Sequence, residues 1–192
     1  THGVFRMVLT LDGELVTDVE PHIGYLHRGS EKLAEERTYT QIVTLTDRMD
    51  YVSPMLNNQS YMLAVEKLAG IEPTQRGVWL RMIAAELQRI ASHLVATGFL
   101  LQDLGALGTP LIYAMREREN ILDLFEMLCG ARITNSYLRP GGVFMDAPTE
   151  FWPALDRELV DIVNTLDELE EYLSGNEIVF SRTKGTAVLA PE

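Results

Sequence analysis

The chain has 192 residues, 46% of them apolar, and a formal net charge of −12 at pH 7. That length is enough for one large domain or two small ones with a real core. The negative charge argues against a nucleic-acid partner and gives no polybasic signal for anionic lipid. A single cysteine, Cys129, excludes a disulfide within the chain and a metal site made of cysteines alone.

We expect no membrane-spanning helix, because no apolar run reaches the roughly 18–20 residues that a span needs. No signal peptide is visible, which favours a cytoplasmic setting. The chain opens at Thr1 without Met and stops at Glu192, so both ends look like cuts in a longer protein.

The first part of the chain is predicted to form a small antiparallel β segment. Residues 3–20 contain two β-rich runs around Asp12-Gly13, a strong two-residue turn signal. A short acidic helix is expected over residues 31–37. Residues 38–45 are ambiguous, because their β-branched side chains compete with a helical continuation.

Four long helices are predicted to follow. Their expected ranges are 54–69, 74–104, 109–129 and 153–173. Two of them begin with a capping side chain and a proline, at Ser53-Pro54 and Thr109-Pro110. In the second and the last, apolar residues recur every three or four positions, which indicates one buried face.

These elements predict the α+β class, with the small N-terminal antiparallel β segment followed by a mainly α-helical bundle. We expect three parts. They are a hairpin-containing segment over 1–46, the helical bundle over 47–175, and a strand and turn over 176–192.

The stretch 47–54 lies between the β segment and the helices. It holds one cation, two carboxylates and the phenol of Tyr51 just before a helix N-terminus, where backbone N–H groups favour electron-rich ligand atoms. A polar loop with a satisfied tyrosine is the simpler interpretation. Asp103 ends an apolar run, where an unpaired carboxylate is costly to bury. It either caps the next turn or partners a donor such as a histidine, and His2 and Tyr51 are candidate donors to a carbonyl ligand.

Common catalytic motifs are absent from the sequence. There is no glycine-rich phosphate loop, no HExxH frame for zinc and no nucleophile elbow.

Seven motifs do stand together in the order of a known family. They are Thr1-His-Gly-Val4, His22-Ile-Gly-Tyr-Leu-His-Arg-Gly29, Asp47-Arg-Met-Asp-Tyr51, Glu86-Leu-Gln-Arg-Ile-Ala-Ser-His93, Asp103-Leu-Gly-Ala106, Arg116-Glu-Arg-Glu119 and Arg139-Pro-Gly-Gly-Val143. Over essentially its whole length the chain resembles the D subunit of NADH-quinone oxidoreductase, the quinone-site subunit of respiratory complex I. Members are about twice as long, so the resemblance implies an N-terminal half.

The resemblance also implies what kind of cavity to expect. The family is related in fold to the large subunits of nickel–iron hydrogenases, whose metal is held by two CxxC pairs, one of them near the position of residues 48–53. This sequence has no thiolate there and cannot hold a soft metal centre in that way, so we expect no metal site. The same cavity is implied to take the quinone headgroup.

Five residues receive roles from the resemblance. His2 and Tyr51 are implied to contact the quinone headgroup as proton donors, and Asp103 is implied to pair with His2. Together they form the expected catalytic set. Arg28 and Arg48 are implied to lie near the iron–sulfur cluster of a neighbouring subunit.

The implied function is quinone reduction by electrons from that cluster, coupled to proton translocation, in an enzyme subunit that as a fragment is inactive. Menaquinone or ubiquinone is the expected substrate, and NADH, FMN and the iron–sulfur clusters belong to partner subunits. Expected partners are the iron–sulfur subunit facing the cavity, the C subunit of the complex and the membrane arm. The expected location is peripheral, on the cytoplasmic face of the membrane.

One departure and two rival interpretations accompany this assignment. Many members have a histidine at the position of Thr134, and its absence here favours menaquinone. A hydrogenase-type metalloenzyme is disfavoured by the single cysteine. A non-catalytic structural or assembly protein that retains the fold is the second alternative, which the presence of His2, Tyr51 and Asp103 opposes.

Overall fold

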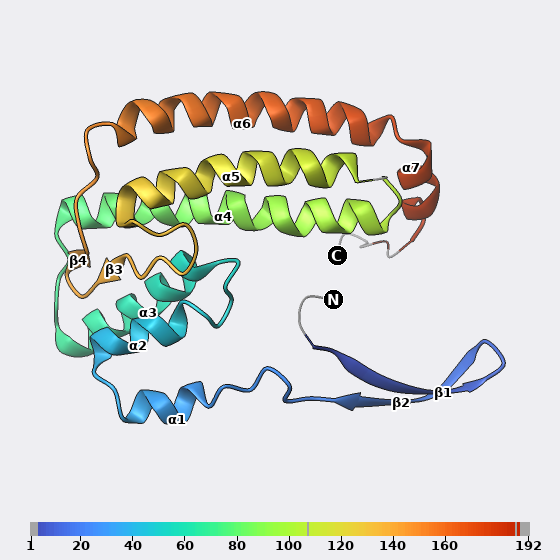
Figure 1. The fold of residues 1–192 in the computed structure, drawn as a ribbon, viewed down its shortest axis with the longest axis horizontal. Coiled ribbons are helices and arrows are strands. Elements are labelled where there is room, and N and C mark those ends of the chain that lie inside the picture. The colour runs from blue at the N-terminus through green and yellow to red at the C-terminus, as the bar shows by residue number, and fades with distance from the viewer. Residues whose placement is uncertain (1–3, 107, 187, 189–192) are drawn as a thin grey trace. The chain divides into compact units, whose positions relative to one another are not determined.

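The computed structural model describes residues 4–106, 108–186 and 188 (Figure 1). Its elements in chain order are β1 (Arg6–Asp12), β2 (Leu15–His22), α1 (Ser30–Glu35), α2 (Tyr39–Thr46), α3 (Pro54–Ala69), α4 (Gln75–Asp103), α5 (Thr109–Cys129), β3 (Leu138–Arg139), β4 (Gly142–Val143), α6 (Phe151–Ser174) and α7 (Glu177–Thr183). A short antiparallel hairpin followed by mostly helical segments confirms the predicted α+β class.

The chain divides into two compact units, Thr1–Thr38 and Tyr39–Glu192. The division falls earlier than the boundary expected after residue 46. The two boundaries differ because of α2, whose residues could have formed either a strand or a helix from their sequence. Val43 and Thr46 of α2 are buried in the second unit, so this helix belongs with the bundle.

In the first unit, β1 pairs with β2 from Arg6 opposite His22 to Asp12 opposite Leu15. The turn falls at the predicted place, and Gly13 has a φ of 63°, the left-handed region that a two-residue hairpin turn requires. A shift of register between Thr10 and Leu11 marks a bulge.

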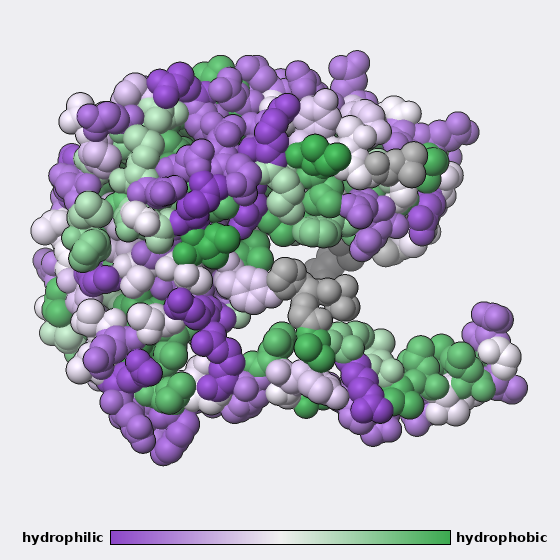
Figure 2. Space-filling model, in the orientation of Figure 1, coloured by the Kyte–Doolittle hydropathy of each residue, from purple (hydrophilic) through white to green (hydrophobic). Residues whose placement is uncertain are grey.

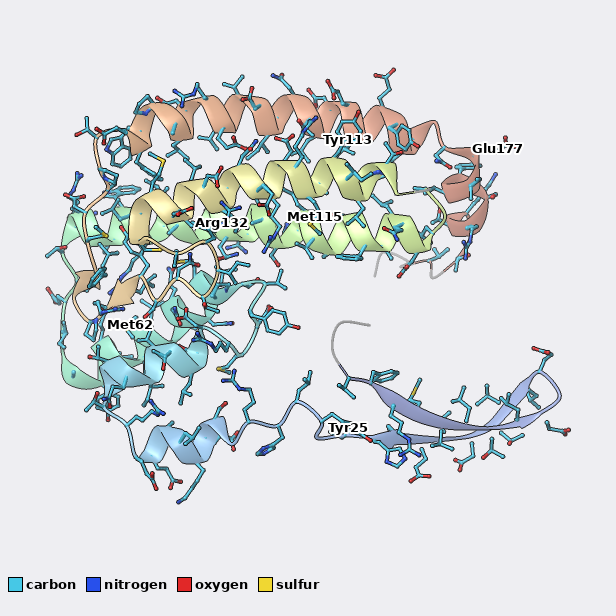
Figure 3. The ribbon with its side chains drawn as sticks, in the orientation of Figure 1. Tyr25, Met62, Tyr113, Met115, Arg132 and Glu177 are labelled. Carbon is cyan, nitrogen blue, oxygen red and sulfur yellow. The ribbon has the colours of Figure 1, made fainter. Side chains whose placement is uncertain are left out.

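In the second unit, α4 and α5 lie side by side as the centre of the bundle, with α6 along α5, the shorter α3 beside α4 and α2 beside α3 (Figure 1). Thr74 caps α4 by accepting a hydrogen bond from the Gly77 amide. The core fills the space between these helices, and its largest fully buried side chains include Tyr137, Phe125, Phe151 and Met62, the last labelled on α3 in Figure 3.

The C-terminal segment corrects a prediction. We expected a strand and turn over residues 176–192, but Glu177–Thr183 form the helix α7. Asn176 is its N-cap, and its side-chain oxygen accepts hydrogen bonds from the amides of Ile178 and Val179. This cap outweighs the strand preference of the β-branched pair that follows.

The short ladder of β3 and β4 is held by a buried ion pair. Arg81 of α4 and Glu66 of α3 are 3% and 4% exposed, and their side chains meet at 2.5 Å and 3.0 Å. Arg81 also donates to the carbonyls of Arg139 and Gly142, while the Gly141 amide donates to Glu66. The pair thereby fixes the turn between the two strands.

Candidate functional site

The segment Asp47–Ser53 joins α2 to α3 and carries Tyr51, the residue with the sharpest expected role. Its two ends are anchored. At its start, the Asp47 side chain is fully buried, and at its end the Val52 carbonyl accepts a hydrogen bond of 2.8 Å from Gln88 in the middle of α4. Between these anchors Tyr51 is 40% exposed. The segment is therefore a fixed loop that presents a phenol at the surface of the second unit.

Internal hydrogen bonds shape the rest of this segment. The Asp50 carboxylate accepts from the Val52 amide at 3.1 Å, and the Asp50 carbonyl accepts from the Asn57 side chain at 3.0 Å. Ser53 is the N-cap residue of α3 and Pro54 its first residue, as predicted. The Ser53 side chain makes no capping hydrogen bond, and its carbonyl accepts from the Leu56 and Asn57 amides at 3.2 Å.

A second loop, residues 131–139, packs against the start of the segment. The Ser136 amide donates to the Asp47 carboxylate at 3.2 Å, and Arg139 donates to the Ser136 carbonyl at 2.6 Å. Thr134 and Ser136 both have positive φ, 53° and 44°. Such backbone is unfavourable for a β-branched residue, so the contacts around this loop hold it in a strained shape.

Asp103, the last residue of α4, is exposed rather than buried. The sequence singled out Asp103 because burying an unpaired carboxylate is costly, but in this structure the carboxylate is not buried. Arg182 of α7 donates to the Asp103 and Leu104 carbonyls at 3.4 Å and 3.2 Å. Asp103 lies fifteen residues beyond Gln88, which corresponds to about 22 Å along the helix axis. A ligand touching both Asp103 and Tyr51 would have to extend along α4.

The remaining expected site residues are placed only in part. His2 lies outside the described residues, so its pairing with Asp103 stays a prediction. Arg28 and Arg48 are both exposed, but they belong to different units of the chain. Arg48 donates to the Thr44 carbonyl at 2.9 Å, one turn back along α2.

The described residues were also searched for metal ligands and for membrane-spanning helices. No group of three His, Cys, Asp or Glu side chains that could hold a metal ion occurs among the described residues. The Cys129 thiol donates to the Phe125 and Ala131 carbonyls, and burial is the main cause that raises its pKa, so it is held as a thiol. Within the part of the chain that the structure describes, no helix is both long and apolar enough to cross a bilayer.

A groove of about 550 Å³ lies between α4, α5 and the C-terminal part of α6. Its lining is mostly apolar and includes Leu94, Leu101, Pro110, Leu166 and Leu173. Neither Tyr51 nor Asp103 lines it, so this groove is distinct from the expected site.

Sequence reasoning missed the residues that hold the segment in place. Asn58 donates to Asp47 at 2.5 Å, and Gln88 donates to Val52, yet both looked like ordinary polar residues on helices. Asp47 was noticed only as one of two carboxylates near Tyr51. Its burial could have been suspected from the apolar residues just before it, but its partner Ser136 lies 89 residues away, and no spacing rule reaches that far.

Comparison with known proteins adds to this geometry. The family model of the respiratory-chain NADH dehydrogenase 49-kDa subunit matches residues 103–192. The NADH-quinone oxidoreductase D subunit of Dehalococcoides mccartyi is 56% identical over 192 residues, which is 100% of this chain and 52% of that protein. The D subunit of Clostridium beijerinckii is 53% identical over the same share of each chain. The D subunit of Rhizobium etli that carries the number 2 is 54% identical over 193 residues, covering 100% of this chain and 47% of its own length.

The chain thus has a hairpin and a helical bundle that contains an anchored polar loop, and the three D subunits are similar to it over its whole length. Over its full length the chain is similar to bacterial D subunits of NADH-quinone oxidoreductase, and its residues 103–192 match the family model of the 49-kDa subunit of respiratory NADH dehydrogenase. It spans about half the length of the curated relatives that it matches.

Proposed function

We propose that this chain contributes the quinone-headgroup site, with its proton donors, to a proton-translocating NADH:quinone oxidoreductase. The names of its relatives support the class of enzyme. The observation that carries the proposal is the anchored Asp47–Ser53 segment, in which Tyr51 is 40% exposed shortly before the start of α3. A phenol held in a fixed place can donate a hydrogen bond to a ligand carbonyl without first being ordered.

The chemistry needs proton donors more than a redox centre from this chain. Reduction of a quinone to its quinol takes two electrons and two protons. In this proposal the electrons come from an iron–sulfur cluster on a neighbouring subunit. Tyr51 donates a proton to one carbonyl oxygen and His2 to the other, and Asp103 orients His2. Both donors then regain their protons from water.

Cofactors and partners follow from the same proposal. Menaquinone or ubiquinone is the substrate, and NADH, FMN and the iron–sulfur clusters are held by partner subunits. The partners are the iron–sulfur subunit facing the cavity, the C subunit and the membrane arm, in a complex whose peripheral part lies on the cytoplasmic face of the membrane. Exposed Arg28 and Arg48 would stabilise the reduced cluster as cations.

The test is Tyr51→Phe in the assembled enzyme, because this change removes only the phenol oxygen and its proton. Loss of a donor aimed at developing negative charge is expected to lower quinone-reductase turnover by roughly 10²–10³-fold. Tyr172→Phe is the matched control, since its phenol is 43% exposed on α6, far along the chain from the segment.

Electron transfer from NADH to a soluble acceptor, which bypasses the quinone, should be unchanged in both variants. Equal turnover of wild type and Tyr51→Phe with several quinones would instead assign Tyr51 to structure and favour a non-catalytic role for this part of the chain.

A further inference from the structure

Asp47 is the buried acid at the start of the Tyr51 segment, and the proposed function leaves it without a role. Its side chain is 0% exposed, just after the end of α2. One carboxyl oxygen, Oδ1, accepts from the Asn58 side chain at 2.5 Å and from the Ser136 amide at 3.2 Å. Asn58 is itself fixed, because its own oxygen accepts from the Thr46 hydroxyl at 2.6 Å. Asp47 therefore ties three parts of the chain together.

Its other oxygen, Oδ2, is buried and has no hydrogen-bond partner among the described residues. The charged and titratable groups facing it are Arg48, Arg139 and the Cys129 thiol. The two guanidinium groups are directed elsewhere, to the carbonyls of Thr44 and Ser136. From α3 the contact is the neutral Asn58 amide. Asp47 is thus a buried acid without an ion pair in the described structure.

An ionised carboxylate in this place would share its charge between Oδ1, which accepts two hydrogen bonds, and the buried Oδ2, which accepts none. A buried charged oxygen without a donor is costly even with Arg48 and Arg139 nearby. A proton on Oδ2 removes the charge and leaves Oδ1 free to accept both hydrogen bonds. Burial raises the pKa of Asp47, and the hydrogen bonds from Asn58 and Ser136 oppose that rise without cancelling it.

The bond to Ser136 has a structural consequence. Ser136 has a φ of 44°, a backbone conformation that a serine adopts only when its surroundings compensate the strain. The Asp47 acceptor is one such compensation. Asp47 is also the first residue of the segment that carries Tyr51, four positions further along the chain. Asp47 therefore fixes both the strained loop and the start of the segment.

We propose that Asp47 is a positioning residue whose neutral, protonated form fixes the 131–139 loop to the segment carrying Tyr51. This assignment depends on the contacts of Asp47 alone. The effect on Tyr51 as a proton donor rests on the proposed function.

The experiment compares Asp47→Asn, Asp47→Ala and Asp50→Asn in the assembled enzyme. An asparagine has nearly the shape of a protonated aspartic acid and keeps the accepting oxygen, whereas alanine removes the acceptor. Asp50 is the matched control, an exposed carboxylate three residues away in the same segment.

The first measurement is the infrared difference between wild type and each variant, recorded as the pH is lowered from 7. The wild type should show a carbonyl stretch of a protonated carboxylic acid that Asp47→Asn lacks and Asp50→Asn keeps. If the difference at Asp47 consists of carboxylate stretches alone at every pH above the ordinary value of 3.8, the group is ionised throughout and the proposal is overturned. This readout uses no quinone, so it is independent of whether Tyr51 is a donor.

The second measurement is amide hydrogen exchange over residues 131–139. We expect at least about tenfold faster exchange in Asp47→Ala, and a change within about threefold in Asp47→Asn. Equal acceleration in both variants would mean that the charge is required, which contradicts the proposal. Should Asp47→Ala fail to assemble, the infrared comparison with Asp47→Asn still decides.

The pH dependence gives a third readout with a definite sign. Because the pKa of Asp47 is raised in the folded protein, the stability due to its proton is complete below the ordinary value of 3.8 and is lost as the pH rises through the raised pKa. Asp47→Asn has no such titration. The exchange rate of the 131–139 loop should therefore rise with pH more steeply in wild type than in this variant, after correction for intrinsic exchange.

Discussion

At the scale of single residues, Glu66 and Arg81 form a buried ion pair in which every side-chain nitrogen and oxygen has a hydrogen-bond partner. Arg81 uses three of its nitrogen atoms, on Glu66 and on the carbonyls of Arg139 and Gly142. The hydrogen bond from Arg81 is the main cause that lowers the pKa of Glu66. A buried pair of this kind contributes little when compared with an apolar replacement, but removing one partner leaves a buried, uncompensated charge.

Glu66→Gln is therefore expected to lower the free energy of unfolding by about 3–5 kcal/mol. Glu86→Gln is the matched control, because Glu86 pairs with Arg89 on the exposed face of α4 and its loss should change stability little. Urea unfolding of the wild type and both variants measures these changes in the free energy of unfolding. Similar losses in the two would show that burial of the pair is not what makes Glu66 important.

The same pair predicts a pH dependence. The pKa of Glu66 is lowered in the folded protein, so the stability that it contributes is present above its ordinary value of 4.5 and is lost as the pH falls through the lowered pKa. Wild type should thus lose stability below about pH 4.5 more steeply than Glu66→Gln.

The structural role of a residue could be predicted from the sequence where it depends on adjacent residues, and not where it depends on distant ones. The turn at Asp12-Gly13 was predicted correctly because its chemistry resides in adjacent residues. The role of Arg81 could not be predicted in this way, since its partner Glu66 lies on another helix at a separation of 15 residues. Burial of a charge depends on what packs over it, and sequence spacing does not show this.

At the scale of elements, start and stop signals placed the long helices well. The predicted range 54–69 matches α3, and 109–129 matches α5, because a proline at the start and a left-handed glycine at the end mark both. For α7 the signal was present but was overlooked. Asn176 precedes two β-branched residues that suggested a strand, while its side chain caps a helix.

We predict that Asn176→Ala destabilises α7 by about 1 kcal/mol, because the amides of Ile178 and Val179 lose their acceptor. Hydrogen exchange over residues 177–183 should become roughly fivefold faster, with α6 unchanged. Asn176→Ser keeps a capping oxygen and should retain most of the protection. Asn164→Ala, at an exposed position of α6, is the control for the loss of an asparagine in general.

At the scale of the whole molecule, large apolar side chains remain in contact with solvent. The hairpin exposes most of its apolar residues, which form the green surface along β1 and β2 in Figure 2. On α6 the predicted apolar stripe is only half buried. Leu155 and Ile162 are in the core, while Leu159 and Leu166 are 43% and 46% exposed, and Val163 beside them is 57% exposed.

This partial burial shows that the sequence pattern predicts the apolar face of a helix but not how much of that face is buried. The three-and-four spacing on α6 correctly predicted a helix with an apolar face, and that face contacts α5 through Leu155 and Ile162. Periodicity cannot tell which neighbour covers a face, or how much of it is covered. The groove of about 550 Å³ between α4, α5 and the C-terminal part of α6 is lined by Leu166 of this stripe.

Soluble monomers rarely expose contiguous apolar patches larger than a few hundred Å². We therefore predict that the 192-residue chain, when produced by itself, self-associates with rising concentration and binds a hydrophobic dye. Replacing Leu159, Val163 and Leu166 together with glutamine should reduce both effects without changing the helix content, because these side chains lie outside the core. Replacing the buried Leu155 and Ile162 instead should unfold the helix from α5 and increase dye binding. Sedimentation velocity measures the self-association, and circular dichroism measures the helix content. A wild-type chain that stays monomeric and does not bind the dye would contradict the prediction.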